Sequence, residues 1–485
     1  MRGCALNYRQ TVLPYKVRAL ADGTRLGISS SGDFAFLSPE DLSFLDGVGA
    51  TPSLERLAEL QSRFFVSSSA PSSGTRRLLR SRKAAKREAV QKGPALHIIV
   101  PTLQCGHSCQ YCQVSRSLED VSHTISDSDL RLACDSIFQS GADSLTVEFQ
   151  GGDPLLRFDL VKKAIVQITE RNAVERRRIR FVVASTLHQL NREMCEFFSV
   201  HGAYLSTSID GPQHLHDRNR PIASRDAYAK TMQGVLLARE MLGHDSVSAL
   251  MTSTKLSLSS PTEIVDEYVR LGFQDIFIRP LSSYGFAKRN QATLGYSIED
   301  FRTFYQQAFE RVLYWNNKGV KLREVYASIL LNKILSSFDS GYVDLQSPSG
   351  AGIGALVYNY DGYVYPSDEA RMLGEMGDHS LRLGRIGDSL TSLLHAPIQR
   401  DLIKASLVDY VPGCRTCAYN QFCAPNPVDA QAQFGSPFAP VALTEHCQRH
   451  LWMFDFFYTQ LRVADETTLD LFYDWAAPTG DAESS

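Results

Sequence analysis

The sequence predicts an α/β protein whose largest part is a partial (β/α)6 TIM barrel, and two observations predict this fold class. From Ala95 onward, apolar strand-like runs alternate with amphipathic segments of roughly 15 to 40 residues, which suit crossover helices. This alternation implies right-handed βαβ units and a parallel sheet, and six runs indicate a partial barrel rather than one of eight strands. In addition, a group of cysteines directly follows the first run, at the strand end where such folds place their chemistry. The runs are HIIVPT, LTVEFQ, RFVVAS, AYLSTS, SVSALMT and DIFIRP, starting at residues 97, 145, 180, 203, 246 and 275.

Length and composition exclude several classes of protein. At 485 residues the chain corresponds to about three domains. Its 50 Lys and Arg against 53 Asp and Glu give a formal net charge of −3, too balanced for a protein held to nucleic acid or lipid by bulk charge. With 44% hydrophobic residues it is expected to be globular. It shows neither a signal-peptide core nor an apolar run near the roughly 18 residues of a membrane span, so we expect a cytoplasmic protein with no membrane or nucleic-acid partner.

Residues 1–70 are predicted to form a small α+β module. YKVRAL, LGISSS and FAFL are three short strand candidates, and the turn Ala21-Asp22-Gly23 separates the first two. Ser38 and Pro39 begin the first of two or three short helices, with Ser38 as the cap. The Ser-rich stretch SSSAPSSGT at 67–75 then reads as a flexible linker.

The remaining boundaries follow from changes in composition. Residues 71–94 form a basic linker or helix, since eight of the seventeen residues between Arg76 and Lys92 are Lys or Arg. A run this short is usually a solvated helix face, and the alternative is a grip for an acidic partner or nucleic acid. The barrel is expected over 95–320 and a cysteine-rich extension over 321–465. Regular structure is hard to assign between Ser336 and Pro366, and 466–485 is expected to be a C-terminal tail with a frayed end.

The first group of cysteines predicts an open iron-sulfur site. Cys105, Cys109 and Cys112 lie on the loop that follows the first strand. Three thiolates at this spacing can hold three irons of a cubane [4Fe-4S] cluster and leave the fourth iron free for a small molecule. The alternative is a structural zinc site, for which His107 or His123 would supply the fourth ligand.

The second group of cysteines offers a complete set of ligands. Cys414, Cys417, Cys423 and Cys447 supply four thiolates, enough to close either a cluster or a zinc site, and ligand count alone does not choose between them. The other cysteines, at positions 4, 134 and 195, are expected to be ordinary small apolar residues.

The first cysteine loop resembles the signature of the radical S-adenosylmethionine (SAM) enzymes, CxxxCxxC with an aromatic residue before the last cysteine, here Tyr111. The resemblance implies that the open iron binds the amino and carboxylate groups of SAM. An electron from the reduced cluster then cleaves SAM to methionine and a 5'-deoxyadenosyl radical, which takes a hydrogen atom from the substrate. The protein's part is to orient the cofactor and exclude water.

Residues after the second, third and fourth strands fit the same resemblance. The segment from Gln150 to Pro154 resembles the family's GGEP motif with Asp in place of Glu, and its glycines allow the backbone to approach a ligand closely. The alternatives are an ordinary turn for this segment and a turn cap for Asp210. The residues that the resemblance assigns to SAM are Tyr111, Gln150, Gly151, Gly152, Asp153, Ser208 and Asp210, with Ser185 and Thr186 as weaker candidates.

The second cysteine group resembles the C-terminal SPASM region of peptide-modifying radical SAM enzymes, which holds two auxiliary [4Fe-4S] clusters. That region has the pattern Cx9-15Gx4C, then Cx2Cx5Cx3C, then a last Cys. Here Ser349, Ser367 and Pro427 stand at three of the cysteine positions, all of which serve the cluster nearer the active site. The resemblance therefore implies one auxiliary [4Fe-4S] cluster, the outer one. In the related sulfatase-maturing enzymes an Asp after the corresponding cysteine is the proposed base, which points to Asp368 here; a surface-loop role is the alternative.

Taken over nearly the whole chain, GDFAFLSPED, SCQYCQVSR, YPSDEARML and CAYNQFC resemble the His-Xaa-Ser system radical SAM maturases of the HxsB type. The N-terminal module resembles a winged-helix peptide-recognition domain, to whose sheet edge a leader peptide adds as a strand. The resemblance implies a small ribosomal peptide with His-Xaa-Ser repeats as substrate, and a crosslink, oxidation or epimerisation as the modification. It also implies a second radical SAM maturase, a small accessory protein and a flavodoxin- or ferredoxin-type electron donor as partners.

Other classes of function stay open at this point. A radical SAM enzyme acting on RNA would explain the basic stretch and would show salt-dependent RNA binding. Sulfatase-maturase-like protein oxidation is a further alternative. A non-enzymatic zinc protein would contain zinc, lack labile sulfide and fail to cleave SAM.

Overall fold

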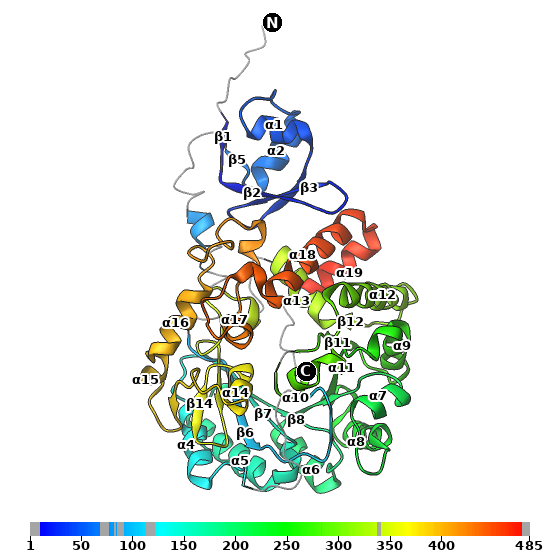
Figure 1. Cartoon of the computed structure of the whole chain (residues 1–485), viewed down its shortest axis with the longest axis vertical. Helices are drawn as coiled ribbons and strands as arrows, with labels where there is room; N and C mark the ends of the chain where they lie inside the picture. The colour runs from blue at the N-terminus through cyan, green and yellow to red at the C-terminus, as the bar shows by residue number, and fades with distance from the viewer. Residues whose placement is uncertain are drawn as a thin grey trace, which may run out of the picture.

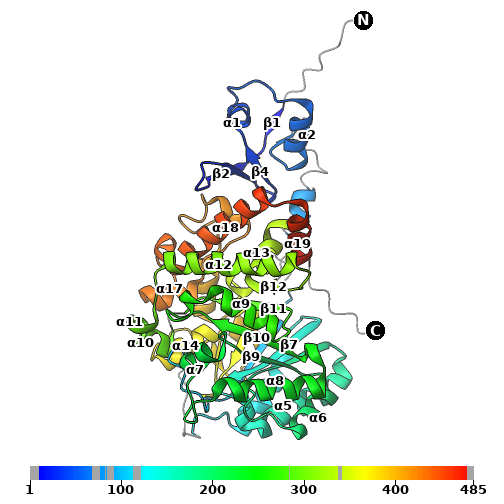
Figure 2. The ribbon, with the colours of Figure 1, turned by 90° about the vertical axis from the view of Figure 1, so that its right-hand side faces the viewer.

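The computed structural model of this chain describes residues 10–67, 77–81, 84, 92–112, 122–282, 284–336 and 341–477. Figures 1 and 2 show three parts stacked along the long axis: a small N-terminal module, a C-terminal helical part beneath it, and the barrel at the far end. Residues 68–75 of the predicted linker, most of the basic stretch and the last eight residues lie outside the described residues.

The N-terminal module has the strands that its sequence predicts. β2 (Tyr15–Ala19), β3 (Arg25–Ser29) and β4 (Phe34–Leu37) form an antiparallel sheet in that order. Ser38 caps α1 (Pro39–Leu45), as expected. The structure adds a full capping box with Asp41, and α2 (Leu54–Ser62) follows. A two-stranded ribbon of β1 (Thr11–Val12) and β5 (Val66–Ser67) was not predicted, because two residues are too short to show a period.

All six predicted barrel strands are confirmed, and neighbouring strands pair in parallel. Alternate strand residues are apolar and buried in the main core, whereas those that line the interior cavity include Glu148, Ser206 and Arg279. The carboxyl ends of the strands meet at one rim, so side chains that follow the strands gather there. The strands are β6 (Leu96–Thr102), β7 (Ser144–Gly151), β8 (Arg178–Ala184), β9 (Tyr204–Ser208), β10 (Val247–Thr252) and β11 (Asp275–Arg279).

Helices cover the outside of this sheet, as Figure 2 shows for α5, α6 and α8. Several begin at the polar caps that end the preceding loop, for example Ser126 before α4 and Asn191 before α6. Their apolar faces pack on the strands and form the main core of the molecule. The helices are α4 (Asp127–Ile137), α5 (Phe158–Glu175), α6 (Arg192–His201), α7 (Gln213–Asn219), α8 (Ala227–Leu242), α9 (Pro261–Arg270), α10 (Gly285–Arg289), α11 (Gln291–Leu294) and α12 (Ile298–Asn317).

The sheet extends beyond the six predicted strands on both sides. β12 (Arg323–Glu324) pairs with β11, while β13 (Ala355–Tyr358), β14 (Tyr363–Tyr365) and β15 (Gly384–Arg385) continue from β6. β13 is parallel to β6 and fully buried, so the stretch that was hard to assign from sequence forms one wall of the barrel rim. These strands have two to four residues each, too few for a period to be read.

The C-terminal part is helical and carries the second group of cysteines. A short 3-10 helix, η5 (Ala418–Gln421), lies between Cys417 and Cys423. The helices are α13 (Val325–Leu335), α14 (Asp368–Glu375), α15 (Leu390–Leu394), α16 (Pro397–Ser406), α17 (Pro427–Phe434), α18 (Glu445–Val463) and α19 (Glu466–Ala476).

Part of the predicted C-terminal tail is a docked helix. α19 occupies the first half of the stretch 466–485 and packs on α13, where Ser328 and Asn332 donate hydrogen bonds to the carbonyls of Trp475 and Ala476. Phe472 and Trp475 are buried beside Phe309 of α12. The aromatic residues of this short segment find their partners on distant helices, which is why the sequence alone suggested a tail.

Candidate active site

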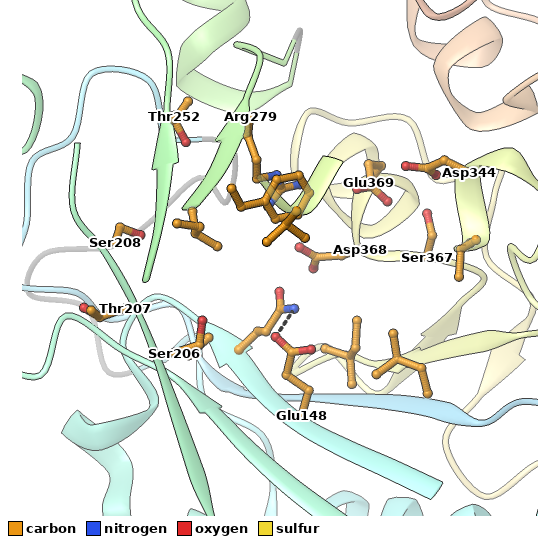
Figure 3. Close-up of a pocket in the computed structure, with 18 of the residues that line it drawn as sticks. Glu148, Ser206, Thr207, Ser208, Thr252, Arg279, Asp344, Ser367, Asp368 and Glu369 are labelled. Atoms are coloured by element: carbon orange, nitrogen blue, oxygen red, sulfur yellow. Dashed lines mark hydrogen bonds between the residues drawn. The ribbon is translucent and has the colours of Figure 1, made fainter. Parts of the chain in front are cut away.

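A cavity of about 940 Å³ opens at the carboxyl ends of the barrel strands. Its wall brings together residues from the first cysteine loop, from the ends of β7 to β11, from the start of α14 and from residues 341–344. Figure 3 shows Ser206, Thr207 and Ser208 of β9 on one side, with Asp344, Asp368 and Glu369 on the other. Strand ends and the C-terminal part thus build one site together.

The three cysteines of the first group line this cavity, as predicted. Cys105 and Cys109 are buried and Cys112 is partly exposed. Burial raises the pKa of the Cys105 thiol, and the nearby Asp153, Cys109 and Cys112 add to the effect. The three cysteines thus line one cavity, which is the placement that a shared metal centre would require. His107 and His123, the zinc alternatives, do not line the cavity; His107 instead contacts His188, with 3.1 Å between the Nε2 atoms.

Gly151 and Gly152 line the cavity, and the structure shows why glycine is needed there. A Cβ on Gly152 would lie 2.1 Å from the carbonyl oxygen of Gln104, and one on Gly151 would lie 2.3 Å from that of Thr102. The end of β7 therefore packs directly against the start of the cysteine loop. Backbone hydrogen bonds fix the contact, from Gly152 N to Thr102 O at 2.9 Å and from Asp153 N to Gln104 O at 2.7 Å.

We expect Gly152→Ala to displace the cysteine loop, because the added methyl group clashes with backbone that cannot rotate away. Overpacking of this kind costs about 1 to 3 kcal/mol of stability. Iron content per chain after anaerobic reconstitution is the measurement, and it should fall well below wild type. Gly106→Ala, in the same loop, is the matched control, since its methyl group would meet nothing within 4 Å. Equal loss of iron in both variants would contradict this account of Gly152.

Asp153 lies behind the cavity wall. It is fully buried, does not line the cavity, and accepts hydrogen bonds from the hydroxyls of Ser185 at 2.7 Å and Thr186 at 2.5 Å. It therefore ties the end of β7 to the end of β8. Ser185 and Thr186 themselves line the cavity, as does Gln150.

Asp210 is also buried behind the wall, although Ser208 from the same strand end lines the cavity. The Tyr111 hydroxyl donates to both carboxylate oxygens of Asp210, at 2.8 and 3.0 Å, and Arg220 Nη1 donates to the Tyr111 oxygen at 2.6 Å. Burial raises the pKa of Asp210, and Arg220 opposes that rise. Of this network, only Tyr111 and Arg220 line the cavity.

The wall facing β9 is rich in carboxyl groups. Glu148, Asp344, Asp368 and Glu369 all line the cavity, and Figure 3 shows Asp368 between Arg279 and Glu148. Burial raises the pKa of Glu148, of Asp344 and of Glu369, and the carboxyl groups of Asp344 and Asp368 raise that of Glu369 further. The Arg279 guanidinium acts in the opposite direction on all three. The pKa of Glu369 is raised to about 7, so this wall holds a carboxyl group that is able to exchange a proton near neutral pH.

Asp368, the predicted base, pairs with a buried arginine. Its Oδ1 atom accepts from Arg371 Nε at 2.8 Å and lies 2.7 Å from Arg371 Nη2. Arg371 is completely buried, whereas the Asp368 side chain is 14% exposed and lines the cavity. The Arg371 guanidinium also interacts electrostatically with the Cys112 thiol, and that of Arg220 interacts with Cys109. One buried and one partly buried guanidinium therefore lie beside the cysteine loop.

The cysteines of the second group lie together in the C-terminal part. Cys414 and Cys417 precede η5, Cys423 follows it, and Cys447 lies in the first turn of α18. Burial raises the pKa of Cys414 to about 12 and also raises those of Cys423 and Cys447, and the neighbouring thiols contribute in each case. Four free thiols are a donor set that suits an iron-sulfur cluster or zinc. Among the described residues, however, no three Cys, His, Asp or Glu side chains converge as ligands of a single ion would.

The three positions that depart from the two-cluster pattern take part in ordinary backbone structure. Ser349 N donates to Ser406 Oγ at 2.9 Å, the Ser367 hydroxyl caps α14, and Pro427 is the first residue of α17. Cys134 and Cys195 are buried in the main core, as expected of small apolar residues, and Cys4 lies outside the described residues.

The side chains that the sequence analysis did not assign, and that line the cavity or support it, include Glu148, Arg220, Arg279, Asp344 and Arg371. Arg279 had a usable signal, because a charged residue that ends a predicted barrel strand points to a site. Glu148, Arg220 and Asp344 lie in no motif, and only the folded chain brings them to the cavity.

Comparison with known proteins shows the fold of the chain. Residues 99–268 match the model of the Radical SAM superfamily. An uncharacterized protein of Methanothermobacter thermautotrophicus is 26% identical over 181 residues, which is 37% of this chain and 65% of that protein. The serine-type anaerobic sulfatase-maturating enzyme of Bacteroides thetaiotaomicron is 28% identical over 143 residues, which is 28% of this chain and 34% of that enzyme. The chain thus spans less than two thirds of each of these relatives.

Two solved structures share the fold over more of the chain. anSMEcpe with bound AdoMet has a TM-score of 0.64 at 18% identity and covers 78% of this chain and 99% of its own. Streptococcus suis SuiB bound to precursor peptide SuiA has a TM-score of 0.54 at 14% identity and covers 91% of this chain and 100% of its own. The chain therefore has the radical SAM fold. In the part of the chain that the structure describes, no helix is both long and apolar enough to cross a membrane.

Proposed function

We propose that this chain is a maturase that cleaves SAM reductively and uses the 5'-deoxyadenosyl radical to modify a ribosomally made peptide. The observation that carries the proposal is a single cavity shared by the three-cysteine loop and a wall of carboxyl groups. A radical generator and groups able to take a proton thereby face the same substrate space.

The residues present fit a [4Fe-4S] cluster and SAM. Cys105, Cys109 and Cys112 would hold the cluster, which supplies the electron for SAM cleavage. Gln150, Ser185 and Ser208 face the cavity and would contact the polar groups of SAM. Asp153 and Asp210 would act from behind the wall, because each is already hydrogen-bonded to residues that line it. The four C-terminal cysteines would hold one auxiliary [4Fe-4S] cluster, with zinc as the alternative occupant.

Asp368 is proposed as the base. Its Oδ1 atom is bound to Arg371, so Oδ2 is the atom able to accept a proton from a substrate in the cavity. Arg371 fixes the carboxylate in place, and Arg279 lies above it in Figure 3. Closure of the cavity over a bound peptide would exclude water from this exchange.

The proposed substrate is a small peptide with His-Xaa-Ser repeats, and the open edge of the N-terminal sheet supports peptide docking. On β4, the outward carbonyls of Phe34 and Phe36 accept hydrogen bonds from Arg63 and Arg56, so this edge is covered. The backbone hydrogen bonds at both ends of β2 show that its even-numbered residues are the ones hydrogen-bonded to β3. The backbone groups of residues 15, 17 and 19 therefore point outward, and no backbone hydrogen bond to them occurs within the described residues. An added strand would pair there.

Val17→Pro should weaken binding of such a peptide about tenfold, because proline removes an outward donor and blocks strand pairing. Fluorescence anisotropy with a labelled leader peptide of a His-Xaa-Ser-repeat precursor measures this. Val17→Thr keeps the backbone donor and should bind as the wild type does. Undiminished binding by Val17→Pro would exclude the β2 edge as the docking site.

The test of the proposed function is turnover. Reconstituted protein, SAM, dithionite and a His-Xaa-Ser-repeat precursor should give 5'-deoxyadenosine together with a modified peptide. Mass spectrometry would show loss of two hydrogen atoms for a crosslink or oxidation, and deuterium incorporation from heavy water for an epimerisation. Deoxyadenosine formation without any change in the peptide would reject this substrate class. We further propose that a second radical SAM maturase, a small accessory protein and a flavodoxin- or ferredoxin-type electron donor act with it.

A second candidate is oxidation of a serine or cysteine in a folded protein. The match to a serine-type sulfatase-maturating enzyme and the position of Asp368 in the cavity favour it. An aldehyde formed on a short sulfatase-derived peptide, detected with a hydrazide reagent, would support this candidate over the first.

A further inference from the structure

The N-terminal module contacts the loop that carries the second group of cysteines. In Figures 1 and 2 the module sits on the C-terminal helical part, far from the barrel. Lys16 of β2 donates from Nζ to the carbonyl oxygen of Arg415 at 2.6 Å and to that of Cys417 at 3.1 Å. One ammonium group thereby ties together two carbonyls of the segment between Cys414 and Cys417.

A second set of contacts holds the other side of the same loop. Arg18, also on β2, forms two hydrogen bonds to Asp455 of α18, at 2.9 and 2.6 Å. Asp455 also accepts from the Tyr419 hydroxyl at 2.5 Å, and Tyr419 belongs to η5, between Cys417 and Cys423. The module thus reaches the loop both directly and through α18, the helix that begins with Cys447 in its first turn.

Apolar contacts make this interface continuous. Phe34 of β4 packs edge to face on Tyr458 of α18, with 5.0 Å between the ring centroids. Tyr458 stacks on Tyr419 at 5.7 Å, and both rings are almost completely buried. The cysteine loop is therefore held between the module and α18.

We propose that the N-terminal module forms one wall of the C-terminal metal site, and that Lys16 is a positioning residue for the loop bearing Cys414 and Cys417. Loop carbonyls that face away from the metal need donors, and a charged donor from another domain fixes them more firmly than water does. In other metal sites, mutation of groups that orient the ligands in this way typically lowers metal affinity about 10- to 100-fold. The inference rests on the proposed function, since it requires that the four cysteines bind a metal.

The experiment uses the full chain carrying Cys105→Ala, Cys109→Ala and Cys112→Ala, so that any bound metal belongs to the C-terminal site. Iron and zinc per chain are measured first, followed by the rate at which the metal passes to a chelator. Lys16→Met should release its metal about tenfold faster than the parent. Lys16→Arg, which keeps a charged donor, should release it at a rate much closer to that of the parent.

Lys163→Met is the matched control, since Lys163 makes an exposed ion pair with Asp127 on the barrel and should leave the release rate unchanged. Arg18→Met tests the same interface through Asp455 and should also speed release. Far-ultraviolet circular dichroism verifies that each variant is folded. Release from Lys16→Met at the parental rate would overturn the inference while leaving the metal site intact. A parent that binds no metal would overturn the proposed C-terminal metal site, and the inference with it.

Discussion

Replacing Cys105, Cys109 and Cys112 together by alanine should abolish formation of 5'-deoxyadenosine and lower iron from about eight to about four atoms per chain. These three thiols are the cysteines that line the cavity, and a cubane cluster cannot be held at the barrel rim without them. Iron, labile sulfide and zinc are measured after anaerobic reconstitution, and deoxyadenosine is followed after dithionite and SAM are added.

The outcomes separate the two metal sites. Cys134→Ala is the control, because this cysteine is buried in the main core and should leave iron content and SAM cleavage unchanged. Four irons plus one zinc in the wild type would keep the radical chemistry and make the C-terminal site structural. Zinc alone, with no deoxyadenosine, would reject the proposed enzyme.

Asp368→Asn should lower peptide modification by about 10² to 10⁴, the range typical for loss of a general base, while SAM cleavage continues. Only the proton acceptor at the cavity wall is removed, and the cysteine loop is left in place. Single-turnover assays that follow deoxyadenosine and modified peptide in parallel measure the two steps separately.

The substitution Asp368→Asn needs a control, because it leaves the buried guanidinium of Arg371 without the carboxylate that it pairs with. An unpaired buried charge costs about 3 to 5 kcal/mol, so the single variant is also expected to be less stable. The double variant Asp368→Asn/Arg371→Met removes the unpaired charge. It should regain stability but not peptide modification if Asp368 is the base. Recovery of modification in the double variant would show that Asp368 acts only by pairing with Arg371.

Local patterns in the sequence were enough to predict the six barrel strands and to place the first group of cysteines at the mouth of the barrel. The six barrel strands were predictable because each run is long enough to show its apolar pattern and each is separated from the next by a helical segment. The position of the first cysteine group was predictable because these residues directly follow the first predicted strand. The helix cap at Ser38 was likewise visible in the local sequence.

Roles that depend on distant residues were not predictable in the same way. Gly151 and Gly152 were expected to make room for a ligand, and the structure adds that they make room for the carbonyls of the cysteine loop. Asp153 and Asp210 were assigned to SAM, yet each lies behind the wall in hydrogen bonds to residues from other strands or loops. The sequence around Asp153 and Asp210 gives no indication of these hydrogen-bond partners.

Periodicity and spacing along the chain were sufficient to predict the barrel, its six parallel strands and the two groups of cysteines. The folded chain was needed to show which carboxyl groups face the cavity, that Arg371 is buried against Asp368, and that Lys16 contacts a loop some 400 residues away. Such contacts depend on how helices and strands pack across the whole chain. That packing depends on the burial of many side chains from all parts of the chain. It therefore cannot be inferred from any single segment of the sequence.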